Sequence, residues 1–332
     1  MLALRPPLRV AAVALSAMLA FALAGPLPGR AATPPAACAN APVAGTYDVN
    51  VSSGGLQRTA LVHVPASLPA GPPAPLVLAL HGAYGSGPGM QSYSGFSNIA
   101  DADDFIVAYP SAVGRFWNIS GAASQPDDVA FIRALITTLE STMCIDTSRV
   151  FATGVSNGAG MVALLGCDLS SQLDGIAAVA GDYDHLPACH LRRPVPLLEI
   201  HGTADQIAAY RGKHPPATID ALPPFVVAWA RRDGCAGPPL SSGVATRTVL
   251  FSWTKCARGS TVEHIRIIGG RHQWPGATPP DPGPRATICA SCTIWSFFDS
   301  LGPQHLPPAG GGALVSGGTG GGGTGGGGGA SP

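Results

Sequence analysis

The sequence has little charge. Charged residues make up 11% of its 332 residues, against roughly 25% in typical domains, and 46% of the residues are hydrophobic. Lys and Arg number 19, as do Asp and Glu, so the formal net charge is zero. Because a basic excess is what attracts nucleic acids and anionic membrane surfaces, we expect neither partner. The composition is compatible with a large buried core.

The N-terminal apolar run is too short for a stable membrane span. Residues 10–24 give about 15 apolar positions, where a transmembrane helix needs roughly 20. Arg5 and Arg9 precede the run, which is the arrangement of a signal peptide. We expect a signal peptide within 1–32 and a Pro/Ala-rich lead-in over 33–44. Cys38 raises the alternative of a lipid anchor, but the usual aliphatic residue three positions before such a cysteine is missing.

The sequence also has several cysteines and a glycine-rich C-terminal segment. Eight cysteines in a chain with an export signal favour disulfides over metal sites. Residues 303–332 end the chain in a segment that is mostly glycine with a little Ser and Thr. Such a segment cannot bury enough apolar surface to fold, so we expect disorder there. One folded catalytic domain is therefore expected over 45–302.

The pattern of apolar runs predicts an α/β fold. Alternating segments at 47–51 and 58–64, with Gly54 and Gly55 between them, predict a β-hairpin. Continuous apolar runs, typical of strands buried on both faces, lie at 75–80, 105–110, 175–180, 195–201 and 262–268. Helical patterns lie at 127–143, 221–232 and 294–301. Alternating strands and helices indicate a mostly parallel central sheet with helices on both faces.

The central motif is Gly154-Val-Ser156-Asn-Gly158. A β-rich run precedes it, and small and apolar residues suited to a helix follow. This pattern is typical of a nucleophile elbow, where the serine sits on a sharp strand-to-helix turn. The glycines let the backbone bend, and the helix N-terminus faces the developing negative charge. An ordinary Gly-rich strand–helix turn is the alternative, so the interpretation depends on a matching acid and histidine.

Two later loops supply the acid and the histidine. Asp205 follows the run at 195–201, and His272 follows the run at 262–268 in a glycine-rich loop. The order Ser, Asp, His is that of α/β-hydrolases, and the C-terminal ends of parallel strands meet at one edge of a sheet. Ser156 is the expected nucleophile, His272 the base that takes and returns its proton, and Asp205 the group that orients the imidazole.

Two backbone N–H groups are expected to hold the oxyanion. One belongs to Asn157, directly after the nucleophile, and the other to Ala83, in the His-Gly-Ala-Tyr-Gly loop after the run at 75–80. Removing one such donor costs roughly 10²–10³ in rate. His81 and His201 stand in His-Gly corners at strand ends, where they are expected to shape the loops.

Four further residues near these motifs leave alternatives open. Asp182 and Asp184 follow the run at 175–180 and are rival acids, although they precede the usual place for one. Trp117 and Trp274 flank the expected site, where an aromatic ring either packs in the core or lines a substrate pocket. No metal or organic cofactor is implied.

Six motifs in order resemble the poly(3-hydroxybutyrate) depolymerase and feruloyl esterase family, with mycobacterial lipoprotein-type depolymerases most similar in style. They lie at 80–87, 117–118, 127–131, 154–161, 201–205 and 269–276. The resemblance spans about 45–302. It implies a secreted α/β-hydrolase of the carbohydrate-esterase type with Ser156, Asp205 and His272 as its triad. The chain departs from the family pattern at Ala83 and Phe116, where the family often has Cys, and at Arg271, where it has Gly.

The same resemblance implies a disulfide between Cys235 and Cys256. Cys167 and Cys189 are a plausible local pair. The pairing of the remaining cysteines stays open, and the Cys-x-x-Cys at 289–292 is expected to be structural.

The predicted function is a secreted serine esterase that hydrolyses carboxylic esters through an acyl-enzyme. Its substrates are expected to be 3-hydroxyalkanoate oligomers or polyester, or feruloyl-type aryl esters on polysaccharide. An envelope acyltransferase similar to the mycolyltransferases is the alternative. A non-catalytic surface-binding protein on a retained hydrolase scaffold is the third hypothesis. The expected location is extracellular or in the cell envelope.

Overall fold

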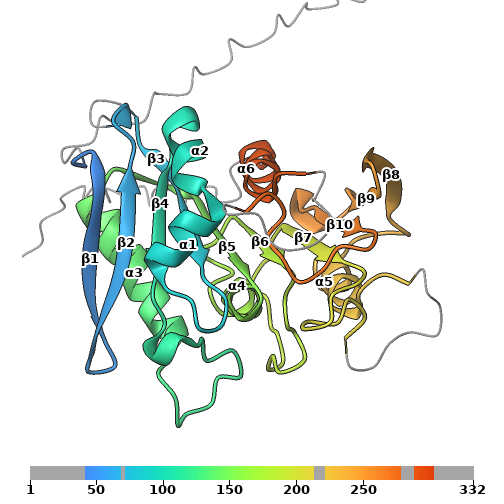
Figure 1. Ribbon diagram of the computed structural model, residues 1–332, viewed down its shortest axis with the longest axis horizontal. Coiled ribbons are helices and arrows are strands. Elements are labelled where there is room, and N and C mark those ends of the chain that lie inside the picture. Colours follow the sequence, from blue (N-terminus) through green and yellow to red (C-terminus); the bar gives the residue numbers. More distant parts are fainter. Residues whose placement is uncertain (1–41, 69–71, 213–220, 278–287, 303–332) are drawn as a thin grey trace, which may run out of the picture. The chain divides into compact units, whose positions relative to one another are not determined.

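The computed structural model describes residues 42–68, 72–212, 221–277 and 288–302 (Figure 1). The expected signal peptide, Cys38 and the glycine-rich tail after residue 302 lie outside these ranges, as does most of the lead-in. None of the helices within the described ranges combines the length and the apolar character that a membrane crossing requires.

The described strands form one ten-stranded sheet in the order β1-β2-β4-β3-β5-β6-β7-β10-β9-β8, which runs across Figure 1. Its six middle strands, from β4 to β10, are parallel, and antiparallel pairs close both edges. The predicted mostly parallel sheet is confirmed. The strands are β1 (Gly45–Ser53), β2 (Leu56–Val64), β3 (Ala74–Leu80), β4 (Ile106–Pro110), β5 (Ile145–Val155), β6 (Gly175–Val179), β7 (Leu197–Gly202), β8 (Leu240–Ala245), β9 (Thr248–Trp253) and β10 (Val262–Ile267).

Helices cover both faces of the sheet, as predicted. One face carries α3 (Asp128–Thr142), α4 (Asn157–Asp168) and α5 (Pro224–Arg232). The other carries α1 (Gly87–Ser94), α2 (Phe96–Asp103) and α6 (Ala290–Ser300). Short 3₁₀ helices within the described residues include η2 (Val113–Arg115) and η3 (Ala257–Gly259).

The apolar sequence of β3 explains why helices cover the sheet on both faces. All seven residues of β3 are buried. Leu76, Leu78 and Leu80 pack into the core under α3 and α4, while Val77 and Ala79 pack into the core under α2 and α6. Side chains alternate across a strand, so a strand without polar positions requires an apolar layer on each side.

Local sequence signals set several element boundaries as expected. Gly54 and Gly55 have φ of +58° and +77° and join β1 to β2 in a two-residue turn, which confirms the predicted hairpin. The Asp127 carboxylate accepts a hydrogen bond from the Ala130 N–H at 2.8 Å and caps α3, so the predicted helix begins where its aspartates stand.

Two α-helices and two strands were not predicted, and two predicted helices have different limits. The short helices α1 and α2 and the hairpin of β8 and β9 are additions; β8 has an exposed, polar sequence that lacks an apolar pattern. The helix expected at 221–232 begins only at Pro224, after a further proline. The helix expected at 294–301 begins earlier, at Ala290, because the Cys289 sulfur accepts from the Cys292 N–H and caps it.

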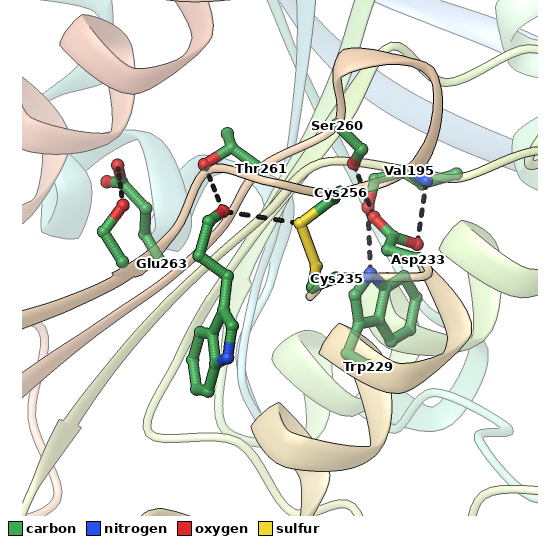
Figure 2. The surroundings of a disulfide bond; sticks show 10 residues. Val195, Trp229, Asp233, Cys235, Cys256, Ser260, Thr261 and Glu263 are labelled. Carbon is green, nitrogen blue, oxygen red and sulfur yellow. Dashed lines mark hydrogen bonds between the residues drawn. A yellow bond between two sulfur atoms is a disulfide. The ribbon is translucent and has the colours of Figure 1, made fainter. Parts of the chain in front are cut away.

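A disulfide and a buried carboxylate fasten α5 to the sheet (Figure 2). Cys235, after α5, is bonded to Cys256, after β9, as the family resemblance implied. The adjacent Asp233 carboxylate accepts from the Val195 N–H at 3.2 Å and from the Ser260 hydroxyl at 2.5 Å. Burial raises the pKa of Asp233 to about 7, despite these hydrogen bonds.

Further disulfides are present elsewhere in the described chain. Cys167 is bonded to Cys189, as expected, and Cys289 to Cys292, a pair that the sequence left open. Cys144 is also disulfide-bonded.

Candidate active site

Ser156 stands on a tight turn between β5 and α4. Its φ of +57° and ψ of −121° are unusual for a residue with a side chain. A Cβ on Gly154 would lie 2.7 Å from the backbone of Gly158, and a Cβ on Gly158 would lie against the carbonyl oxygens of Leu80 and His81. Only glycine therefore fits on either side of the serine, and the predicted elbow geometry is present.

The loop after β3 is fixed by His81. Its Nε2 accepts a hydrogen bond from the Ala112 N–H at 3.1 Å, so its proton is on Nδ1, which donates to the Gly82 carbonyl at 2.7 Å. Burial lowers the pKa of His81 and favours this neutral form. The Trp117 indole donates to the His81 carbonyl at 2.9 Å. His81 thus shapes the loop, which is the role expected for it.

Both expected oxyanion-hole residues lie beside the serine. Ala83 and Asn157 line a cavity together with Ser156. Within the described residues, neither of their backbone N–H groups donates a hydrogen bond. The Asn157 side chain has a role that the sequence did not reveal, because it accepts from the Trp117 N–H at 2.8 Å and donates to the Trp117 carbonyl at 3.2 Å. These bonds tie the elbow to the neighbouring loop.

Asp205 is the carboxylate that contacts His272. His272 Nδ1 donates to Asp205 Oδ2 at 2.8 Å, and Asp205 Oδ1 accepts the N–H groups of Ile207 and Ala208, both at 2.9 Å. Burial alone would raise the pKa of Asp205, but hydrogen bonds from His201 and His272 hold it well below its usual range. The group is therefore ionised at every ordinary pH. The rival acids do not take this place: Asp182 lines a cavity and Asp184 is exposed.

Ser156 and His272 line one cavity of about 320 Å³. Ser156 also lines a second cavity of about 430 Å³, to which His272 does not contribute. Within the described residues, no hydrogen bond joins the serine to the imidazole; such bonds are often loose in a free enzyme and tighten when substrate is bound. The serine thus stands between two cavities, with the imidazole on one side only.

The two tryptophans differ in position. Trp117 is fully buried, and part of its surface forms the wall of the 430 Å³ cavity. Trp274 lines neither cavity. It is 1% exposed, packs edge-on against Phe96 and donates its indole N–H to the Ser291 hydroxyl at 3.0 Å. Its position is that of a packing residue.

A buried polar cluster behind Asp205 was missed by the sequence analysis. His201 Nε2 lies 3.2 Å from Asp205 Oδ2, and His201 Nδ1 lies 2.8 Å from Glu199 Oε1. Glu199 is completely buried in the middle of β7 and also contacts His264. The signal in the sequence was a glutamate within the apolar strand pattern Leu-Leu-Glu-Ile-His. Across the described ranges, no three His, Cys, Asp or Glu side chains are placed to hold a metal ion.

Comparison with known proteins gives the family. The chain is 31% identical over 252 residues to a Nocardia uniformis protein named as the esterase NocK, an alignment that covers 68% of this chain and 73% of that protein. It is 30% identical over 232 residues to feruloyl esterase B of Piromyces equi, covering 65% of this chain but only 42% of that enzyme. The chain thus spans less than half the length of that relative. None of the protein-family models matches the chain.

A solved structure supports the fold. The acetyl xylan esterase from Aspergillus awamori superposes with a TM-score of 0.58 and 16% identity, over 77% of this chain and 99% of that one. At this identity the likeness concerns the fold alone, and it agrees with the mostly parallel sheet covered by helices on both faces. Together with the two sequence relatives, it shows that the chain belongs to the feruloyl esterase-type family of carboxylic ester hydrolases with the α/β-hydrolase fold.

Proposed function

We propose that the protein is a serine esterase that hydrolyses carboxylic esters through an acyl-enzyme on Ser156. One observation carries the proposal: Ser156 and His272 line the same cavity. The serine has an unusual backbone conformation, and the imidazole is hydrogen-bonded to the buried carboxylate of Asp205. An unusual φ held by close backbone contacts is typical of functional positions.

The proposed reaction has two halves. In the first, His272 Nε2 takes the Ser156 hydroxyl proton as Oγ attacks the ester carbonyl, and the same proton passes to the leaving alcohol. In the second, His272 takes a proton from water, hydroxide oxygen attacks the acyl-enzyme, and the serine regains its hydrogen. The imidazole keeps Nδ1–H on Asp205 throughout. The N–H groups of Ala83 and Asn157 hold the oxyanion in both halves.

The two cavities support an assignment of the two arms of the ester. Since His272 must protonate the leaving alcohol, the alcohol occupies the 320 Å³ cavity that His272 lines. The acyl group then occupies the 430 Å³ cavity, whose apolar walls include Trp117, Ile119 and Ile207. These walls suit an aromatic or short apolar acyl group. With relatives named as feruloyl esterases, we place feruloyl-type aryl esters of polysaccharide first and hydroxyalkanoate esters second.

The proposal includes export of the enzyme. Residues 1–32 act as a signal peptide and 33–44 as a lead-in, 45–302 form the catalytic domain, and 303–332 are a tail. Two arginines before an apolar run support the signal peptide. Disulfides support an oxidising destination, extracellular or in the cell envelope.

The test is hydrolysis by purified wild-type and Ser156→Ala proteins. Methyl ferulate and 3-hydroxybutyrate oligomers serve as the two substrates. We expect ferulate release by the wild type and a loss of about 10⁴-fold or more in Ser156→Ala. Ser120→Ala is the matched control, because Ser120 lines the acyl cavity but lies outside the elbow; it should keep most of the activity. Equal rates for Ser156→Ala and wild type would refute the proposal, while release of hydroxybutyrate alone would exchange the order of the substrates.

A further inference from the structure

We propose that His201 is a positioning residue of this site. Held by the buried Glu199, it is an imidazolium that contacts the same Asp205 oxygen as His272, and so limits how strongly that acid stabilises protonated His272. The inference rests on the proposed function, which gives Asp205 and His272 their roles. Its first support is the set of hydrogen bonds around the His201 ring.

The Nε2 atom of His201 must carry a hydrogen. It faces two acceptors, the Ala208 carbonyl at 2.8 Å and Asp205 Oδ2 at 3.2 Å. Neither can donate, since a carbonyl oxygen and an ionised carboxylate only accept. The protonation state of the ring therefore depends on Nδ1, which lies 2.8 Å from Glu199 Oε1. Two hydrogens on the ring make His201 a cation.

His264 and Arg266 are further groups in the surroundings of Glu199 that can carry a positive charge. Arg266 Nε donates to the Tyr210 hydroxyl oxygen at 2.8 Å, which leaves the tyrosine hydrogen for His264 Nε2, also at 2.8 Å. His264 Nδ1 then donates to Glu199 Oε2 at 2.6 Å. In this arrangement His264 is neutral, because its Nε2 is an acceptor. It contributes a hydrogen bond to Glu199 through Nδ1.

Glu199 is thus left with His201 as its counter-ion. Its carboxylate is completely buried, and its remaining partner is the Tyr183 hydroxyl, which donates at 3.2 Å. An ionised carboxylate without a compensating charge is very costly in such surroundings. Burial alone would neutralise both groups, but their mutual attraction prevails: the pKa of Glu199 falls to about 2 and that of His201 rises to about 10. The pair is ionic throughout the range in which an enzyme works.

Other titratable groups surround the pair, and His201 lines a further cavity of about 430 Å³ together with Asp182, Asp184 and Arg211. Arg266 lies over the Tyr210 ring and donates to the Tyr210 hydroxyl oxygen. The Tyr210 ring meets His201 edge-on, with 5.6 Å between ring centroids. On the catalytic side, the cavity that His272 lines also contains two titratable residues, His81 and Tyr93. None of these replaces the contact of His201 with both Glu199 and Asp205.

The consequence concerns the base. In a simple triad, the negative charge of the acid interacts mainly with the imidazole. Here Asp205 accepts hydrogen bonds from Ile207, Ala208 and His272, and its Oδ2, the oxygen that His272 contacts, also lies 3.2 Å from Nε2 of the His201 cation. That cation repels the positive charge that His272 gains on protonation. The base therefore stays neutral, and the enzyme active, to lower pH than Asp205 alone would allow.

The variant Glu199→Gln tests this coupling. The amide keeps the size of the carboxylate, accepts from His264 and donates to Nδ1 of a neutral His201, whose Nε2–H still reaches Asp205. We expect the acid limb of kcat/KM, which reports the free enzyme's base, to move up by roughly half to one pH unit, the scale that Coulomb's law gives for charges within one cluster at an effective dielectric of about 20. The plateau rate should change little.

The matched control is Asp233→Asn, which also turns a buried carboxylate into an amide but lies beside Val195 and Ser260, outside this cluster. Its acid limb should coincide with that of the wild type. His201→Gln should move the limb in the same direction as Glu199→Gln. The proposal is overturned if the acid limb of kcat/KM in a folded Glu199→Gln protein does not move, or moves to lower pH.

A second measurement needs neither a folded variant nor activity. In protein labelled with ¹⁵N-histidine, the ring nitrogens of His201 should both be protonated from about pH 5 to about pH 9, beyond the usual range of histidine. A neutral His201 in the wild type overturns the proposal. Because the same spectrum can be recorded on Ser156→Ala, failure of the esterase reaction and failure of the charged His201 are separate outcomes.

Discussion

The approach of two backbones around Ser156 leaves no room for a side chain at position 158. A Cβ there would press on the carbonyl oxygens of Leu80 and His81, which belong to the strand and loop beside the elbow. The loop after β3 carries Ala83, and with it one of the proposed oxyanion donors. A methyl group at position 158 therefore disturbs the site and the fold together.

For Gly158→Ala we expect a loss of about 1–3 kcal/mol in the free energy of unfolding, the usual cost of overpacking, and a fall in kcat from a displaced oxyanion hole. Urea denaturation and ester hydrolysis measure the two effects. Gly243→Ala in β8 is the control, since a Cβ there meets nothing within 4 Å. Equal stability and activity of the two variants would contradict the close contact.

Some features of single residues can be predicted from the sequence, and others cannot. The glycine spacing and the order Ser156, Asp205, His272 can be identified in the printed chain. The hydrogen bonds of Asn157 to Trp117 and of Glu199 to His264 cannot, because they join residues 40 and 65 positions apart. A buried ionised group is defined by its surroundings, and those exist only in the folded chain.

Among the elements, strands buried on both faces were the easiest to predict. A run such as β3 or β6 is apolar throughout because two layers cover it. The hairpin of β8 and β9 lies at the sheet edge, where β8 is largely exposed, so its residues need no apolar pattern. The helices α1 and α2 have eight residues each, too few for a clear helical period.

The segment between α5 and β10 depends on its disulfide. Cys235 and Cys256 are 21 residues apart and enclose β8 and β9. Closing a loop of this length contributes about 3 kcal/mol. We expect the double substitution Cys235→Ser and Cys256→Ser to lose about that much in the free energy of unfolding by urea denaturation, with the catalytic loops intact.

Cys289→Ser with Cys292→Ser provides the comparison. That bond closes a separation of only 3 residues, and a serine at 289 can still cap α6. Removing this bond should lower the free energy of unfolding clearly less than removing the bond between Cys235 and Cys256. If both double variants lose the same stability, loop closure is not what the longer disulfide contributes.

At the scale of the whole molecule, the pair of Glu199 and His201 makes stability depend on pH in a defined way. The pKa of Glu199 falls from 4.5 to about 2 on folding, so its contribution is complete above 4.5 and is lost as pH falls toward 2. The pKa of His201 rises from 6.5 to about 10, so its contribution is complete below 6.5 and is lost as pH rises through 10. Both contributions are complete together only between pH 4.5 and 6.5.

We therefore expect the free energy of unfolding of the wild type, minus that of Glu199→Gln, to be large in this window and to shrink toward alkaline pH. Urea denaturation of both proteins at a series of pH values measures the difference. Asp233→Asn, which leaves the pair in place, should not show the same alkaline decline relative to wild type. A difference that is constant from pH 5 to pH 10 would mean that the pair is not ionic.

The same pair constrains how the protein can evolve. Replacing Glu199 by an apolar residue removes the counter-ion of His201, and losing His201 strands an anion, so such single substitutions pass through a damaged intermediate. Positions 199 and 201 should consequently be inherited as a unit, replaced together or kept together among descendants. The His-Gly-Thr-Ala-Asp motif at 201–205 then extends two residues upstream, to a glutamate that distinguishes lineages with the buried pair from those with a simple triad.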